Sequence, residues 1–375
     1  MHPVRRARRL PPLLTGVLCV LLASCAPAPA PGPDAAEREV RRAVADWSAA
    51  PPARLAGIPL EGWSYEVDSV RRDGVRALVR ARLRYRLAGY DPAPTGSARD
   101  VELTRDGPAW KVTADRPAPG APPQLWDQGE PAVVRGTASL VLGVGQSAGT
   151  LAAVGREADR AVPAVAAAWP GPWARRVVVL VPGSLDAMAA LLGRPADTYR
   201  GMGAVTTGET GRGPAPADRI VVNPEGYQGL SEAGRRIVLT HESAHVATRA
   251  ATSAKTPQWL SEGFADWVAY RGSALTPAEA APTLTRAVRR GELPGALPDG
   301  ATFAFGGDPE GLGRAYEGAW LACRLIADRW GEPALRTLYE RAGREPLPTA
   351  LEAALGVDLP TLTRDWRAAL RDRLR

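Results

Sequence analysis

Two histidines and a glutamate form the clearest candidate for chemistry in this sequence. His241 and His245 lie four residues apart in the segment His-Glu-Ser-Ala-His, and Glu242 directly follows the first histidine. Residues four apart share one face of an α-helix, so both imidazoles are expected to point toward one spot. Two nitrogen ligands with an adjacent carboxylate match the ligand pair and general base of a catalytic zinc site. The alternative interpretation is a solvated helix with incidental histidines.

A third ligand is expected from a second helix. Catalytic zinc usually takes three protein ligands and leaves one position for water. The remaining histidine, His2, lies in a leader that is expected to be removed, so a carboxylate is expected to complete the site. Glu262 begins a helix after a break at Pro257, and Asp266 lies four residues later on the same face. The alternatives are a helix-start carboxylate favoured by the helix dipole for Glu262 and an ordinary surface residue for Asp266.

These two segments together carry a family resemblance. Trp259–Asp266 reads Trp-Leu-Ser-Glu-Gly-Phe-Ala-Asp, and with the His-Glu-x-x-His segment it resembles the gluzincin metallopeptidases, the thermolysin-like and aminopeptidase-like clan of peptidase MA-like proteins. The resemblance covers about residues 200–340. It implies a zincin-like fold with one Zn²⁺ per chain and Glu262 as the third ligand. It also implies that Asp266 accepts the outer N–H of His241, which would orient that ligand.

Two further segments bear on catalysis and specificity. Arg314–Ala319 resembles the tyrosine-bearing helix of the aminopeptidase branch, which implies that Tyr316 donates to the oxyanion. The alternative for Tyr316 is a core tyrosine whose hydroxyl meets a backbone group. Gly203–Thr207 stands where aminopeptidases of the clan carry a glutamate that holds the free amine of the substrate. That anchor is missing here, although Glu209 lies close. A peptide could still pair with this strand, and an endopeptidase is favoured.

Residues 1–24 predict an export signal. Four arginines between positions 5 and 9 form a basic region, and the apolar stretch Leu13–Leu22 is too short to span a bilayer comfortably. Leu22-Ala23-Ser24-Cys25 resembles the lipobox of bacterial lipoproteins, in which the cysteine becomes the lipid-bearing N-terminus. The alternative is an ordinary cleaved secretory signal. The expected location is therefore outside the cytoplasm, anchored to the membrane through lipid on Cys25.

Charge and cysteine content exclude two other classes. The formal charge is +7, and removal of the four leader arginines leaves +3, which is too small and too dispersed to predict nucleic-acid binding. Cys19 leaves with the leader and Cys25 carries lipid. Cys323 is then alone and is expected as a small buried hydrophobe, so no disulfide framework is predicted.

The length of 375 residues suggests about two domains beyond the targeting segment. Residues 25–35, rich in Pro and Ala, predict a tether, and residues 36–116 predict a small α+β domain that resembles NTF2-like domains. It begins with a helix over Ala35–Asp46, and turns at Asp73-Gly74 and Asp106-Gly107 join hairpins. The expected strands are Trp63–Val70, Val75–Arg86, Ala98–Thr104 and Trp110–Ala114.

Residues 117–130 predict a linker, and residues 131–375 predict the zincin-like domain with a mostly helical C-terminal part, so the whole chain is expected to be α+β. Four strands are expected before the helical part: Ser139–Leu142, Val177–Val181, Ala204–Thr207 and Arg219–Val222. Trp259, Phe264 and Trp267 are expected in the core rather than at the substrate.

These patterns predict a membrane-anchored zinc peptidase outside the cytoplasm, acting on peptides or proteins. Zinc held by His241, His245 and Glu262 would activate a water and polarise the scissile carbonyl. Glu242 would take the proton and pass it to the leaving amine. The alternative is a lipid-anchored binding or scaffold lipoprotein whose zinc is structural. Glu242 speaks against that alternative, because a structural site needs no base and usually has four protein ligands.

Overall fold

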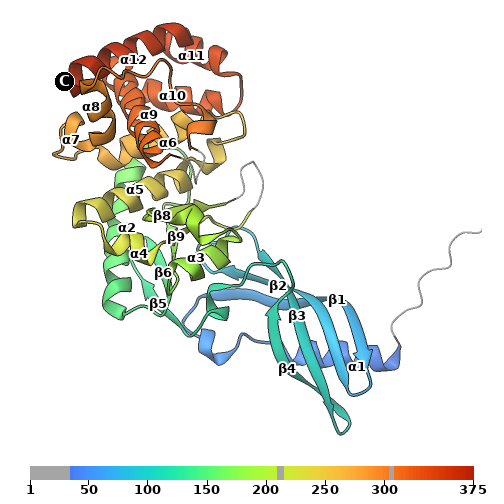
Figure 1. The fold of residues 1–375 in the computed structure, drawn as a ribbon. Coiled ribbons are helices and arrows are strands. Elements are labelled where there is room, and N and C mark those ends of the chain that lie inside the picture. The colour runs from blue at the N-terminus through green and yellow to red at the C-terminus, as the bar shows by residue number, and fades with distance from the viewer. Residues whose placement is uncertain (1–33, 209–214, 304–307) are drawn as a thin grey trace, which may run out of the picture.

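The computed structural model describes residues 34–208, 215–303 and 308–375 (Figure 1). The expected export signal, Cys25, most of the expected tether and Glu209 lie outside these residues. The described chain combines two sheets with many helices, so the expected α+β class is confirmed.

The first unit is one helix on a four-stranded antiparallel sheet, as the sequence predicted. The strands pair in the order β1-β2-β3-β4. Gly74 and Gly107 have positive φ angles of 55° and 60°, which is why glycine follows aspartate in both hairpin turns. The elements are α1 (Ala35–Trp47), η1 (Ala53–Leu55), β1 (Leu60–Asp73), β2 (Arg76–Leu87), β3 (Thr95–Asp106) and β4 (Ala109–Pro117).

The second sheet is mixed and has the strand order β5-β6-β7-β9-β8. Its three central strands run parallel, and the edge strands β5 and β8 are antiparallel to their neighbours. β5 was not predicted as a strand; it begins with Pro131, a residue that an edge strand accepts at its first position. The strands are β5 (Pro131–Arg135), β6 (Ser139–Val144), β7 (Val177–Val181), β8 (Ala204–Thr207) and β9 (Arg219–Val222). The connecting helices are η2 (Leu125–Asp127), α2 (Ala148–Ala168), α3 (Leu185–Leu192), η3 (Ala196–Tyr199) and α4 (Pro224–Gln228).

The two faces of the second sheet are both covered. Because strand side chains alternate between faces, Val141, Val179 and Ile220 pack with α2 and with Leu239 of the metal-site helix α5 (Glu232–Thr248). On the opposite face, Leu142 and the side chains next to it lie in one core with the first sheet, and Val221 packs against α3. The segment expected to link two domains contributes buried Leu125 and Trp126 to this shared core.

Helices make up the rest of the described chain (Figure 1). They form one large core that includes Trp259, Phe264, Trp267 and Cys323, in the positions expected for these residues. After α5 come η4 (Arg249–Ala251), α6 (Gln258–Tyr270), α7 (Pro277–Ala280), α8 (Pro282–Arg289), η5 (Gly300–Phe303), α9 (Pro309–Trp330), α10 (Glu332–Ala342), α11 (Leu347–Leu355) and α12 (Leu359–Leu374). Among the residues described, no helix has the length and apolar character that crossing a membrane requires.

Candidate metal centre

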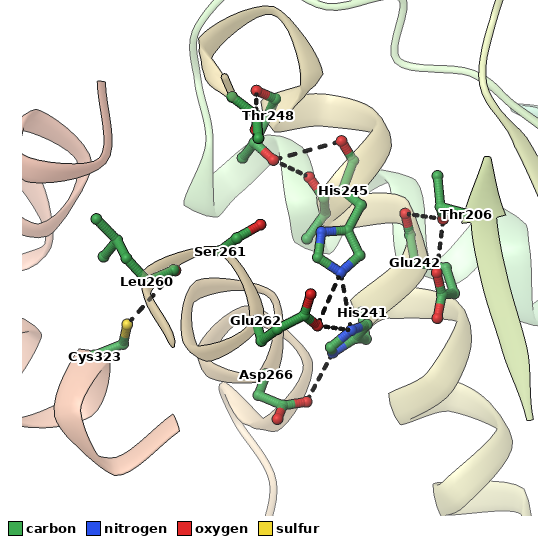
Figure 2. A network of polar contacts seen from close by, with 12 residues as sticks. Thr206, His241, Glu242, His245, Thr248, Leu260, Ser261, Glu262, Asp266 and Cys323 are labelled. Atoms are coloured by element: carbon green, nitrogen blue, oxygen red, sulfur yellow. Dashed lines mark hydrogen bonds and ion pairs between the residues drawn. The ribbon is translucent and has the colours of Figure 1, made fainter. Parts of the chain in front are cut away.

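Helix α5 brings the two histidines together. Ser231 caps its N-terminus by accepting a hydrogen bond from Gly234 N, and Glu232 occupies the first turn, where the helix dipole favours an acid. His241 and His245 then lie on one face, with their Nε2 atoms 3.0 Å apart (Figure 2). The helical spacing therefore gives the convergence of imidazoles that the sequence predicted.

Helix α6 supplies a carboxylate to the same spot. It begins at Gln258, directly after Pro257, and presents Glu262 toward α5 (Figure 2). Glu262 Oε2 lies 3.4 Å from the Nε2 atom of His241 and 3.4 Å from that of His245. The histidines and Glu262 thus place three ligand atoms within 4.8 Å of one another.

The donor set fits a zinc ion. Tetrahedral zinc with bonds of about 2.0–2.1 Å separates its ligand atoms by roughly 3.3 Å. The separations of 3.0, 3.4 and 3.4 Å found here lie close to that value. Burial would raise the pKa of Glu262, but His245 and His241 outweigh it and hold the pKa well below its ordinary value, so the carboxylate is ionised. Two imidazoles and one carboxylate are a known catalytic zinc set.

Asp266 fixes the orientation of one imidazole. Its Oδ1 atom lies 2.8 Å from His241 Nδ1 (Figure 2). A carboxylate at this distance accepts a hydrogen bond from Nδ1–H, so Nε2 of neutral His241 carries the lone pair that points to the common centre. Burial would lower the pKa of His241, but Asp266, then Glu262 and Glu242, raise it well above its ordinary value. A metal ion would therefore have to displace a proton from His241 to bind.

Glu242 lies beside the metal group and has its own partner. Its side chain is buried, and Thr206 Oγ1 donates to Glu242 Oε2 at 2.7 Å (Figure 2). Thr206 belongs to β8, so the edge strand and the metal-site helix meet at the expected base. This contact was not predicted: the sequence placed Thr206 only in the expected strand Ala204–Thr207 and in the segment where an acidic anchor is missing.

Gly263 explains how α9 comes close to the metal group. A Cβ atom at this position would lie 2.3 Å from Ala319 O and 2.6 Å from the Ala319 carbonyl carbon. Only glycine therefore lets α6 pack this tightly against α9, directly after the ligand Glu262. The close approach brings Tyr316 of α9 to the site, with its ring centroid 6.3 Å from that of His241.

The Tyr316 hydroxyl is protonated and can donate a hydrogen bond. Burial, followed by Glu262, Asp266 and Glu242, raises the pKa of Tyr316 well above its ordinary value, so the phenol keeps its proton. Phe303 packs edge-on against the ring with centroids 5.2 Å apart. Within the described part of the chain, the Tyr316 hydroxyl makes no hydrogen bond, which differs from the core tyrosine considered as the alternative.

One open cleft of about 970 Å³ is lined by the three ligand candidates and by Thr206, Glu242, Asp266 and Tyr316. Among the residues described, the carboxylates in its wall are those of Glu242, Glu262, Asp266 and Glu317. Glu317 accepts hydrogen bonds from the backbone N–H groups of Thr283 and Leu284, at the start of α8. Each of these four carboxylates is therefore already engaged by the protein.

Comparison with known proteins gives a distant structural likeness. No protein family matches the sequence, and no curated protein matches it. Among solved structures, a mutant M1 zinc metallopeptidase from Deinococcus radiodurans is similar, with 17% identity and a TM-score of 0.37. The match covers 72% of this chain and 59% of that one, so the chain spans less than two thirds of its length. A likeness this distant does not carry a functional argument.

Proposed function

We propose that the protein is a zinc-dependent peptidase of the gluzincin type, with one Zn²⁺ held by His241, His245 and Glu262. The observation that carries the proposal is the convergence of three ligand atoms to separations of 3.0–3.4 Å inside an open cleft. A carboxylate with its own hydrogen-bond donor lies beside them. The placement of α5, α6 and the edge strand β8 around this centre supports the zincin-like fold.

Each side chain then has a distinct role in hydrolysis. Bound zinc supplies a Lewis acid that polarises the scissile carbonyl and makes water a better nucleophile. Glu242 takes the proton from the attacking water and transfers it to the leaving amine. Thr206 holds the Glu242 carboxylate in position through its hydrogen bond. Tyr316, protonated and free of a hydrogen-bond partner in the described chain, donates to the oxyanion.

The cleft favours endopeptidase activity over aminopeptidase activity. An aminopeptidase needs a free carboxylate to hold the α-ammonium group of its substrate. The four carboxylates in the described wall of the cleft are all engaged, at the metal group, with Thr206 or at the start of α8. β8 is an edge strand, so an extended peptide can pair with its free side at internal residues.

The leader sequence supports a location for this activity at the membrane, outside the cytoplasm. Residues 1–24 act as an export signal, Cys25 carries lipid, and the following Pro- and Ala-rich residues tether the enzyme outside the cytoplasm. The substrates are peptides or proteins near that membrane surface. Mass spectrometry of the native N-terminus tests the anchor. An unmodified residue beyond Cys25 would contradict lipidation and leave the zinc chemistry untouched.

A chelation experiment tests the activity itself. Protein lacking residues 1–25 is assayed on an internally quenched peptide library before and after treatment with a chelator, and again after zinc is restored. We expect cleavage that disappears with the metal, returns with zinc, and occurs at internal bonds. Metal-independent cleavage, or no cleavage by protein that holds one zinc per chain, would refute the proposal.

A further inference from the structure

A second, smaller cavity opens beside the cleft. It has a volume of about 340 Å³ and lies between the first sheet and the face of the second sheet that carries α3. This side cavity is mainly apolar. Its wall includes Pro122, Pro123, Leu180, Leu191, Leu192 and Val221.

The side cavity adjoins the cleft. Leu192, Thr207 and Gly208 line both spaces. Thr207 directly follows Thr206, whose hydroxyl holds Glu242, so the side cavity begins one residue along β8 from the catalytic group. A strand advances about 3.3 Å per residue, which places the entrance within two or three residues of the scissile bond of a peptide paired with β8.

The alternation of side chains along β8 supports the same placement of the side cavity. Thr206 faces Glu242 on α5, whereas Val205 packs with Val221 and α3 on the opposite face of the sheet. A peptide added to the edge of β8 would alternate in the same way. A side chain next to one that faces the metal group would therefore face the side cavity.

The charged groups in the described wall of the side cavity are already paired within the protein. Arg219 donates to both carboxylate oxygens of Asp91, at 2.8 and 2.9 Å. Asp91 is buried and also accepts from the backbone N–H groups of Leu87 and Ala217. The Tyr85 hydroxyl donates to Gln124. These contacts fix the wall, and among the described residues that line it they leave no unpaired charge to attract a charged ligand.

We propose that the side cavity is an extended substrate subsite, on the premise that the chain is the peptidase proposed above. It takes a large apolar side chain of the peptide, two or three residues from the scissile bond, on the side toward the C-terminal end of β8. The first sheet, through Tyr85 and Thr95, then forms part of the specificity site rather than a separate module.

A filling variant tests this subsite. Matched quenched peptides differ only in carrying Phe, Leu or Ser at each position around the cleaved bond. For the unaltered protein we expect kcat/KM to rise about 10- to 100-fold with Phe or Leu at one position two or three residues from that bond. Thr95→Trp fills the cavity and should remove the preference, so that kcat/KM for the Phe and Leu peptides falls to that for the Ser peptide. Thr104→Trp, in the same strand and facing neither space, should keep the preference.

Two further arms separate failure of the subsite from failure of the peptidase. Leu191→Asp places a carboxylate in the side cavity and should shift the preference toward Lys or Arg, which decides the matter if Thr95→Trp does not fold. Peptide binding is also measured by fluorescence anisotropy. If no peptide is cleaved, the peptidase proposal fails, but tighter binding of the Phe peptide that Thr95→Trp abolishes would still support the subsite. Cleavage or binding without an apolar preference, or a preference that Thr95→Trp retains, would overturn it.

Discussion

Two of the charged clusters in the described chain, one in the first sheet and one at the metal group, differ in whether their donors and acceptors are matched. In the first sheet, the side chain of Arg99 is 1% exposed and donates to Asp115 at 2.9 Å and to Asp127 at 2.6 and 3.0 Å. Tyr65 donates to the remaining Asp115 oxygen at 2.6 Å. Donors and acceptors match, and the cluster is complete without a ligand.

The metal group has the opposite balance. His241 Nε2, His245 Nε2 and Glu262 Oε2 approach one another to 3.0–3.4 Å, and Asp266 already accepts a hydrogen bond from the outer N–H of His241. Once both histidines are neutral at Nε2, electron pairs from all three atoms converge on one point. A buried cluster of charges is common in structural roles, but a surplus of acceptors in an open cleft indicates a site for a cation.

Loss of one metal ligand should have the largest effect. In His245→Ala two protein ligands remain, which cannot hold a catalytic zinc, so both zinc content and peptidase activity should fall to background. Zinc is measured by mass spectrometry of metals, and folding by circular dichroism. Full zinc occupancy in the variant would exclude His245 as a ligand.

Glu242→Gln should abolish turnover while the metal stays in place. The amide cannot accept the proton of water, so we expect kcat to fall by about 10²–10⁴-fold with zinc content unchanged. Glu232→Gln, a substitution of the same kind in the exposed first turn of α5, is the control and should leave both unchanged. Cleavage at the parent rate by the Glu242 variant would require another base.

Arg99→Met should act on stability alone. It leaves two partly buried carboxylates, with side chains 21% and 11% exposed, without their cation, which is expected to lower the free energy of unfolding by about 3 kcal/mol. Arg80→Met, in the same sheet, breaks the exposed pair with Asp100 and should lower it by about 1 kcal/mol or less. Urea unfolding measures both variants. Reduced zinc affinity in the folded Arg99 variant would contradict the separation of the two clusters.

Asp266→Ala should have the smallest effect of the four. His241 remains as a ligand but loses the acceptor that fixes its tautomer, so zinc affinity or kcat/KM should fall about 10–100-fold. Competition with a chromogenic chelator measures the affinity. Asp328→Ala on the surface of α9 is the control. Equal values for both variants would reduce Asp266 to a surface carboxylate.

Local signals predicted most of the metal group. The four-residue spacing in α5, the cap at Ser231 and the break at Pro257 are properties of short segments, so His241, His245 and Glu262 could be placed on two helices from the sequence. Their meeting depended on the resemblance to a known family, because no local pattern fixes how two helices approach. The roles assigned to these residues, and to Tyr316, stay predictions until the variants are measured.

Contacts between residues far apart in the sequence could not be predicted from it. The Arg99 cluster joins β3, β4 and η2, and in the sequence its members look like polar positions of solvent-facing strands and a linker. The bond from Thr206 to Glu242 spans 36 residues. Nothing in the sequence indicated that the lack of a side chain at Gly263 sets the distance between α6 and α9. Such contacts depend on the packing of complete elements, which short-range periodicity does not encode.

The core shared by the two sheets has a consequence for how the chain folds. Leu140, Leu142 and Val178 of the second sheet are buried among side chains of the first sheet, and Trp126 between them belongs to the same core. Exposing one sheet would strip apolar surface from the other, so the two halves are expected to unfold in a single cooperative transition. A protease that cuts between the buried residues Leu125 and Trp126 of the joining segment would then have to wait for global opening.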